Sequence, residues 1–356
     1  MTDGATTSLE KYVDLLCCPH CQAVLSLEDQ TIRCTGCDHL FETSDGIPLL
    51  FWPTEGVRRD VTAEVRAFYE VTPFPNYNDI DDVGTLVEKA QEGVFTRLLD
   101  EQIPFWTRVL EVGCGTGQLS NFLSVAARTV VGTDVCLNSL RLGQQFKERN
   151  CLARVAFIQM NLFRPVFRPE TFDLVISNGV LHHTADPRRA FETIATLVRP
   201  NGYILIGLYH RYGRLVTDLR RLIFRAFGDR WQFLDPNLRR RGSSAAKKRA
   251  WFMDQYRHPH ESKHTMGEVL HWFDEVGFEF VHSIPSPVPF RPFSPTEQLF
   301  KPRRRGRALE HLCVELGMAF RGSQQGGFFV MIGKKRRAAN AVASGVSGPS
   351  VNRTRA

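Results

Sequence analysis

Residues 109–117 read VLEVGCGTG, and this stretch decides the fold. The apolar run 109–112 leads directly into a turn that has glycine at every second position. An amphipathic stretch follows, and a second apolar run ends in Asp134. Strand, glycine turn, helix, strand and acid in this order predict the first half of a nucleotide-binding βαβ unit. The glycines let the backbone turn tightly beside a ligand, and the acid can accept hydrogen bonds from both ribose hydroxyls.

The spacing of the glycines separates this turn from a dinucleotide site. A G-x-G-x-x-G pattern starting at Gly113 would need its third glycine where Gln118 stands. Pyrophosphate would sit on the amides at the helix start, where the acidic Glu111, two residues before the first glycine, opposes it. A carboxylate at that position suits a cationic ligand, such as one that bears an ammonium or a sulfonium group.

The motif E-x-G-x-G-x-G, with the acid after the second strand, resembles that of the class I S-adenosylmethionine-dependent methyltransferases. The resemblance implies a Rossmann-like α/β fold with a seven-stranded sheet, and S-adenosylmethionine as cofactor. Some other α/β domain with a glycine-rich turn is the alternative, but strand context, spacing and acid all agree with the methyltransferases. The residues that the resemblance assigns to the cofactor here are Glu111, Gly113, Cys114, Gly115, Gly117 and Asp134.

Later segments extend the resemblance over roughly residues 90–210. The stretch FIQMNL ends in Asn161 and Leu162, which in this family flank the adenine, although the family more often has Asp in place of Asn161. The stretch FDLVISNGVLHHTADP predicts a buried strand with Asn178 at its carboxyl end, where ligands of open α/β sheets bind. It resembles the fourth motif of the small-molecule branch, also called type 11. Segments 278–284 and 326–333 could form the antiparallel pair that closes such sheets.

Two histidines follow the fourth strand, near the expected place of the methyl acceptor. Methyl transfer from a sulfonium is an in-line displacement, so the enzyme mainly aligns the reactants and excludes water. A general base is needed only when the acceptor must lose a proton. His182 or His183 could be that base, and the alternative is that the Leu-His-His turn shapes the pocket and packs.

Four cysteines predict a metal site near the N-terminus. Cys18 and Cys21 form one knuckle and Cys34 and Cys37 a second, with the spacing of a zinc ribbon. Four thiolates close the coordination sphere, so the expected Zn²⁺ is structural. Disulfides are the alternative, but no secretory signal is visible. Cys17, His20 and His39 are further possible ligands, and the cysteines expected to be small core residues are Cys114, Cys136, Cys151 and Cys313.

The segment 15–51 resembles the short zinc-ribbon proteins typified by the activator subunit of eukaryotic tRNA and protein methyltransferases. The bacterial relatives of those proteins end in the same Asp-Gly-Ile-Pro-Leu-Leu run, here residues 45–50. The resemblance implies a docking or stability module without a catalytic role.

The chain therefore divides into a small ribbon and a larger catalytic domain with helical additions. Within the helical segment, an aromatic and proline-rich interruption, 68–79, could pack over the cofactor or simply join two helices. Its candidate lid residues are Phe68, Tyr69, Phe74 and Tyr77. The expected parts are a leader (1–14), the zinc ribbon (15–52), a helical lid or linker segment (61–105), the methyltransferase domain (106–333) with insertions 211–265 and 285–325, and a disordered basic tail (334–356).

A cluster of polar residues lies inside the first insertion, before a helix that Thr265 should cap with Glu268. The cluster comprises His258, His260, Glu261 and His264. It could be a metal site, although a polar loop before a helix is the simpler interpretation. Contact with the substrate or acid–base chemistry is a third interpretation, for His258 or His260. The insertions should lie over the acceptor pocket and decide the substrate.

Charge and composition bear on the partners. The 356-residue chain has a net charge of +7, but six of its basic residues lie in segment 334–356 without an acid, so the rest is close to neutral. No apolar run is long enough to span a bilayer, which predicts a cytoplasmic protein without a membrane span. The sequence leaves the oligomeric state open.

Three functions are compatible with these features. The leading one is methylation of a small or medium-sized metabolite. The second is RNA methylation, because a ribbon before such a domain resembles the bacterial large-subunit rRNA guanine methyltransferases. The near-neutral body and the long insertions speak against RNA. The third is a binding or scaffold protein with a degenerate cofactor site, which the intact glycines and Asp134 disfavour.

Overall fold

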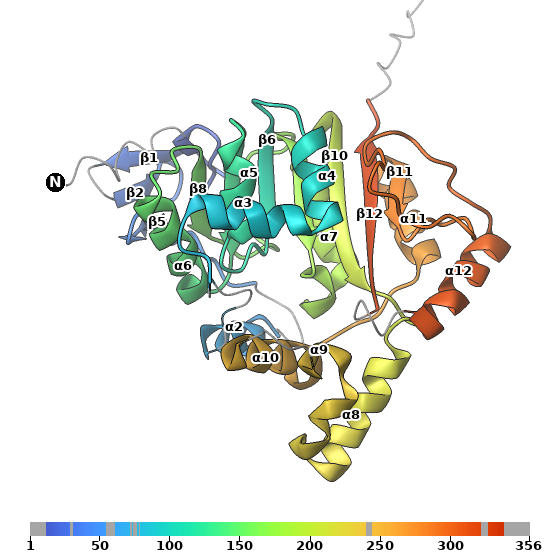
Figure 1. Ribbon diagram of the computed structural model, residues 1–356. Coiled ribbons are helices and arrows are strands. Elements are labelled where there is room, and N and C mark those ends of the chain that lie inside the picture. The colour runs from blue at the N-terminus through green and yellow to red at the C-terminus, as the bar shows by residue number, and fades with distance from the viewer. Residues whose placement is uncertain are drawn as a thin grey trace, which may run out of the picture.

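Alternating apolar strands and amphipathic helices assemble around one central sheet (Figure 1). The computed structural model describes residues 12–28, 31–54, 61–71, 73, 77, 79–239, 244–321 and 327–337. Most of the predicted leader, Phe74 of the predicted lid and the tail from residue 338 lie outside the described residues.

The central sheet has seven strands in the order β11-β12-β10-β9-β6-β7-β8. The five strands from β10 to β8 are parallel, and β12 pairs antiparallel with both β10 and β11. This arrangement confirms the predicted Rossmann-like α/β fold, including the antiparallel pair at its end. The strands are β6 (Arg108–Val112), β7 (Thr129–Asp134), β8 (Val155–Gln159), β9 (Phe172–Asn178), β10 (Val198–Tyr209), β11 (Phe278–Ile284) and β12 (Phe328–Lys335).

Each central strand buries both of its faces, because helices cover the sheet on both sides. Neighbouring residues of a strand point to opposite faces, so Val109 joins one apolar cluster and Leu110 the other. One face packs against α3 (Val83–Glu92), α4 (Val94–Gln102), α5 (Gln118–Val125) and α6 (Leu137–Arg149). The other packs against α7 (Pro187–Ala195), α11 (Met266–Val276) and the N-terminal ribbon.

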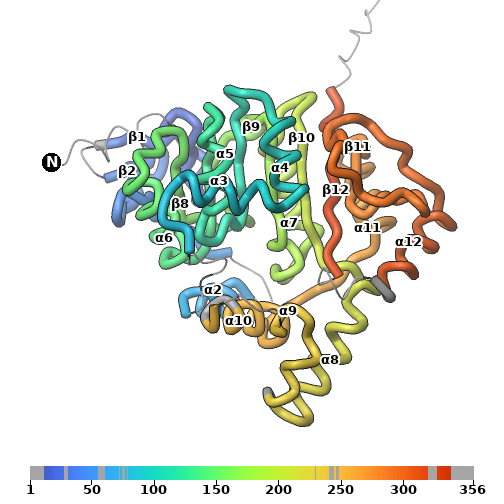
Figure 2. The backbone as a smooth tube through the Cα atoms, viewed as in Figure 1, coloured from blue at the N-terminus to red at the C-terminus, as the bar shows by residue number. Residues whose placement is uncertain are grey.

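The ribbon consists of a three-stranded sheet and a two-stranded sheet and packs on the β8 side of the molecule (Figure 2). The Cys17 amide donates to the Val166 carbonyl at 2.8 Å, and Leu49 forms a parallel bridge to Gln159 at the end of β8. Leu16 and Phe41 of the ribbon share one apolar cluster with the large sheet. This packing covers an edge strand that would otherwise be open. The ribbon strands are β1 (Leu25–Glu28), β2 (Thr31–Cys34), β3 (Leu40–Phe41), β4 (Thr43–Ser44) and β5 (Ile47–Pro48).

Helical segments lie beyond the sheet in the regions predicted as additions. Helix α2 (Thr62–Val71) comes from the segment before the glycine turn. The first insertion contains α8 (Leu215–Phe227), η2 (Asp229–Leu234), α9 (Pro236–Arg239), α10 (Ala245–Phe252) and the π-helical turn η3 (Met253–Arg257). The second contains α12 (Ala308–Arg321), and the turn η1 (Leu181–His183) follows β9. Among the described residues, no helix is both long and apolar enough to cross a membrane.

Candidate functional site

The glycine turn joins β6 to α5 through three residues with left-handed backbone angles. Gly113, Gly115 and Gly117 have φ values of 72°, 54° and 72°, which L side chains rarely adopt. A Cβ on Gly113 would meet the Val180 side chain at 2.4 Å, and one on Gly117 would meet the Phe157 ring at 2.3 Å. Glycine at these two positions therefore brings the turn against both β8 and the chain after β9.

Two backbone amides hold the Asp134 carboxylate at the tip of β7. Gly115 N donates to Oδ2 and Cys136 N donates to Oδ1, each at 2.8 Å. Burial nevertheless raises the pKa of Asp134, because the desolvation outweighs the amide hydrogen bonds. The carboxylate is thus fixed at the place where the sequence predicts contact with a ribose.

Glu111 lies beneath the same turn and is 7% exposed. Its Oε2 accepts a hydrogen bond from Ser120 Oγ on α5. Burial raises the pKa of Glu111 to about 7, because the desolvation outweighs the hydrogen bond from Ser120. A cationic ligand next to Glu111 would favour the ionised form, as expected for a site that takes a sulfonium or an ammonium.

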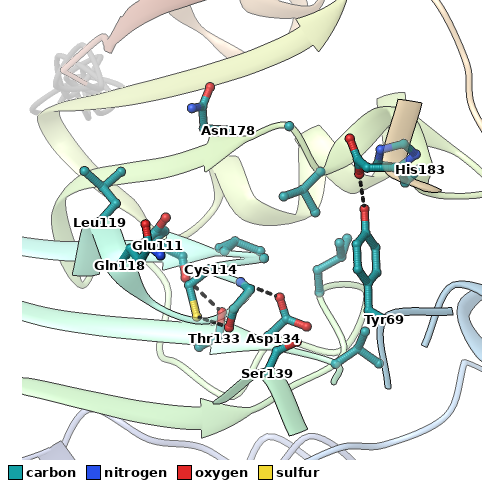
Figure 3. Close-up of a pocket in the computed structure, with 18 of the residues that line it drawn as sticks. Tyr69, Glu111, Cys114, Gln118, Leu119, Thr133, Asp134, Ser139, Asn178 and His183 are labelled. Carbon is teal, nitrogen blue, oxygen red and sulfur yellow. Dashed lines mark hydrogen bonds between the residues drawn. The ribbon is translucent and has the colours of Figure 1, made fainter. Parts of the chain in front are cut away.

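A cavity of about 650 Å³ opens at the carboxyl ends of the parallel strands. Figure 3 shows Glu111 and Asp134 on the side of the glycine turn, with Tyr69 and His183 on the other side. The cavity has room for a nucleoside-sized ligand and an acceptor together. The predicted cofactor residues that line it are Glu111, Gly113, Cys114, Gly115, Asp134, Asn161, Leu162 and Asn178.

The end of the ribbon segment supports the wall near Asn161. The Asn161 Nδ2 donates to the Trp52 carbonyl and to Thr54 Oγ1, both at 2.9 Å, and its Oδ1 accepts from Phe163 N. This side chain is held by the protein itself, so its contact with adenine stays a prediction. The hydrogen bonds tie the ribbon directly to the cavity.

The structure separates the two histidines of the Leu-His-His turn. His183 lines the cavity and its Nδ1 lies 2.8 Å from the His260 carbonyl, which requires the ring proton on Nδ1. Burial lowers the pKa of His183 to about 4, so the ring is neutral with its lone pair on Nε2. His182 is fully buried, with its ring 4.0 Å from that of Tyr209. Of the two residues, only His183 lines the cavity.

The comparisons with known proteins agree with this geometry. A profile described as "Methyltransferase domain" matches residues 110–206, from β6 to β10. Residues 110–206 thus match a methyltransferase domain. The match includes the glycine turn, Asp134, Asn178 and both histidines.

Individual relatives cover parts of the chain. An uncharacterised protein of Synechococcus sp. is 27% identical over 198 residues, 49% of this chain and 48% of that protein. The ubiquinone biosynthesis O-methyltransferase of Haemophilus ducreyi is 28% identical over 111 residues, 30% of this chain and 47% of that enzyme. The solved structure of PKMT2 from Rickettsia typhi in complex with AdoHcy is 15% identical, with a TM-score of 0.49 over 70% of this chain and 55% of that one. The chain spans about half the length of the curated relatives it matches.

The far side of the cavity contains residues that the sequence did not indicate. Trp251, Asp254 and Gln255 from α10 and η3 line it, next to Tyr69 from α2. Tyr69 donates to Asp254 Oδ1 at 3.0 Å, and Gln255 Nε2 donates to Asp254 Oδ2 at 2.8 Å. Burial raises the pKa of Asp254. A carboxylate within the apolar run WFMDQY was the one signal that could have drawn attention to this segment.

The predicted lid residues contact different parts of the methyltransferase domain. Tyr69 reaches the cavity, whereas the Phe68 ring packs 5.1 Å from His258. Tyr77 donates to the Thr116 carbonyl, accepts from Asn121 Nδ2 and stacks on a ring of α6. Of these three residues, Tyr77 is the one that contacts the glycine turn.

The His and Glu cluster of the first insertion is an ion-pair network. Glu261 pairs with Arg214 at 2.7 Å and with Arg221 at 3.0 Å. His264 pairs with Glu268, and the predicted capping box of Thr265 and Glu268 is confirmed. Both arginines neutralise Glu261, so this carboxylate is already paired and is a poor metal ligand. Among the described residues, the grouping able to hold a metal is that of the four ribbon cysteines.

The ribbon cysteines converge as the knuckle spacing predicts. The Sγ atoms of Cys18, Cys21, Cys34 and Cys37 lie within 4.8 Å of one another. Tetrahedral zinc with Zn–S bonds of about 2.3 Å needs sulfurs roughly 3.8 Å apart, so the donor set fits the ion. The Cys17 thiol instead faces Gln22 Oε1.

Two other cysteine predictions are wrong. Cys114 and Cys136 are buried as expected, but Cys151 and Cys313 are exposed. Cys151 stands in a turn after α6 with φ of 54°, and Cys313 lies on the solvent side of α12. Periodicity alone did not distinguish these surface positions from core positions.

Proposed function

We propose that the chain transfers a methyl group from S-adenosylmethionine to a small or medium-sized acceptor. The observation that carries this proposal is a single cavity with a cofactor end, formed by Glu111 and Asp134, and an acceptor end beside His183. When bound, S-adenosylmethionine supplies a methyl group that its sulfonium already activates. The chain itself has to orient the two ligands and exclude water.

At the cofactor end, Asp134 accepts hydrogen bonds from the ribose and Glu111 faces the positive charge. Both carboxyls are held by the turn or by α5, so little ordering is needed on binding. Gly113 and Gly115 let the backbone approach the ligand, and Asn178 offers its side-chain amide from the end of β9.

At the acceptor end, His183 Nε2 accepts a proton from an acceptor hydroxyl. Its neutral state, held by the His260 carbonyl and by burial, provides the lone pair. An oxygen acceptor is also supported by the likeness to a ubiquinone biosynthesis O-methyltransferase. His182 packs beneath the imidazole ring of His183 and does not take part in proton transfer.

We further propose that Cys18, Cys21, Cys34 and Cys37 hold a structural Zn²⁺. The ribbon then stabilises the domain from the β8 edge and supports Asn161 through Trp52.

Labelled methyl donor tests the proposed activity. Purified protein is incubated with methyl-labelled S-adenosylmethionine and fractionated cell extract, and the label is followed into small molecules, lipid, RNA and protein. We expect label in small organic-soluble or water-soluble products with the wild type and none with Asp134→Ala. Label that enters RNA alone would contradict the proposed acceptor class.

A further inference from the structure

Helix α8 turns a row of leucines toward solvent. Leu215, Leu219 and Leu222 are 52%, 58% and 62% exposed. Their spacing of four and three residues places them on one side of the helix. Thr217 and Phe224 are buried on the opposite side, where α8 packs on its own insertion. The three leucines therefore take no part in the packing of α8 against its own insertion.

The row continues into aromatic rings beyond the end of α8. Phe227, Trp231 and Phe233 are 55%, 37% and 55% exposed. The Trp231 ring lies 5.9 Å from Phe227 and 5.6 Å from Phe233, so the three form one group. We call the combined surface the outer face of α8, and its residues are Leu215, Leu219, Leu222, Phe227, Trp231 and Phe233.

Basic residues accompany this apolar surface. Helix α8 contains Arg220, Arg221 and Arg225 but only one acid, Asp218. Arg221 is paired with Glu261 on the inner side, whereas Arg225 is exposed. That acid is already paired with Lys263 at 2.6 Å. Arg230 follows in the turn between the aromatic rings. A basic helix with an apolar stripe and aromatic residues at its end has the composition of helices that lie in a lipid interface.

The position of α8 leaves the outer face accessible. Figures 1 and 2 show α8 projecting from the body, beyond α2 and α10. Its inner side is tied to the cavity wall, since Phe224 packs 4.7 Å from Tyr256 and Arg221 donates to the Gln255 carbonyl at 2.7 Å. A surface bound by the outer face would thus lie next to the segment that forms the acceptor end.

We propose that the outer face of α8 docks on an anionic membrane surface. Leucines and aromatic rings enter the interface while the exposed Arg225 and Arg230 meet lipid phosphates. The charge favours lipid over a second copy of this chain, because a two-fold contact would set the basic α8 against itself. The proposal is independent of methyl transfer, since it rests on the surface of α8 and η2 alone.

Vesicle flotation tests the docking. Full-length protein is mixed with vesicles of phosphatidylcholine, either pure or with an equal part of phosphatidylglycerol, and the bound fraction is measured at low and high salt. The test variant is L219S/L222S. The matched control is L309S/L316S, because Leu309 and Leu316 on α12 are also exposed, at 76% and 49%. Thermal melting checks that both variants fold like the wild type.

We expect the wild type to float with the anionic vesicles and to release as salt increases. L219S/L222S should bind at least about tenfold more weakly, whereas L309S/L316S should bind like the wild type. A wild type that does not float, or equal losses in both variants, would overturn the proposal. A dimer that L219S/L222S dissociates, without vesicle binding, would overturn it by assigning the outer face to a subunit contact.

Discussion

The two ends of the cavity are built in different ways. The cofactor end comes from one continuous run of the chain, in which strand, turn and helix follow each other and backbone amides hold Asp134. The acceptor end comes from distant segments, α2, η1 and η3, which meet through side chains such as Tyr69 and Asp254. Local geometry thus prepares the cofactor site, whereas the acceptor site depends on how an insertion packs.

This difference means that the two ends should respond separately to mutation. A change at the acceptor end should slow methyl transfer and leave cofactor affinity intact. A change at the cofactor end should remove binding before any chemistry can occur.

The largest expected effect at the acceptor end is that of His183→Asn. Asparagine can keep the hydrogen bond of Nδ1 to the His260 carbonyl but has no basic atom at the place of Nε2, so the rate should fall by roughly 10²- to 10⁴-fold. The affinity for S-adenosylmethionine, measured by calorimetry, should stay within about twofold of the wild type.

His271→Asn is the matched control, because His271 is exposed on α11 away from the cavity. Its rate should equal that of the wild type. If His183→Asn loses cofactor affinity as strongly as rate, the two ends are not separable.

A smaller effect should appear at the cofactor end as a pH dependence. The pKa of Glu111 is about 7 in the free protein, and a cationic ligand prefers its ionised form. Affinity should therefore fall as pH decreases through 7, by about tenfold per unit well below that value. The window from pH 7 to 5.5 is suitable, since the ammonium of the ligand stays protonated there.

Glu111→Gln should flatten this profile, because a neutral amide does not titrate. Glu279→Gln, which changes an exposed carboxyl on β11, should keep it. An unchanged slope in Glu111→Gln would assign the titration to another group of the site.

The same contrast explains what the sequence could predict. The first βαβ unit, the glycine turn, Asp134 and the cysteine knuckles follow from short-range patterns with a fixed geometry. Choosing His183 over His182 required the side-chain directions in the turn η1. Asp254 was missed because it lies in an insertion far along the chain from the glycine turn, and tertiary packing alone brings it to the cavity.

The surface positions were likewise beyond sequence patterns. The amphipathic pattern of α8 would ordinarily place its leucines against the body of the protein. Instead, the opposite side of the helix packs into a small apolar cluster of the insertion, formed by Phe224, Leu238, Phe252 and Tyr256. The sequence pattern also failed for Cys313, which was predicted in the core but is exposed on α12. Which side of an added helix is covered depends on its neighbours.

Calorimetric titration of Asp134→Ala with S-adenosylmethionine tests the central claim most directly. Glu279→Ala serves as the matched control, because it removes an exposed carboxyl on β11 outside the cavity. The account predicts micromolar-range binding by the wild type and the control, and a loss of at least about 100-fold in Asp134→Ala, since a charge-assisted pair of ribose hydrogen bonds disappears. Unchanged affinity in Asp134→Ala would contradict the assignment of this cavity to the cofactor.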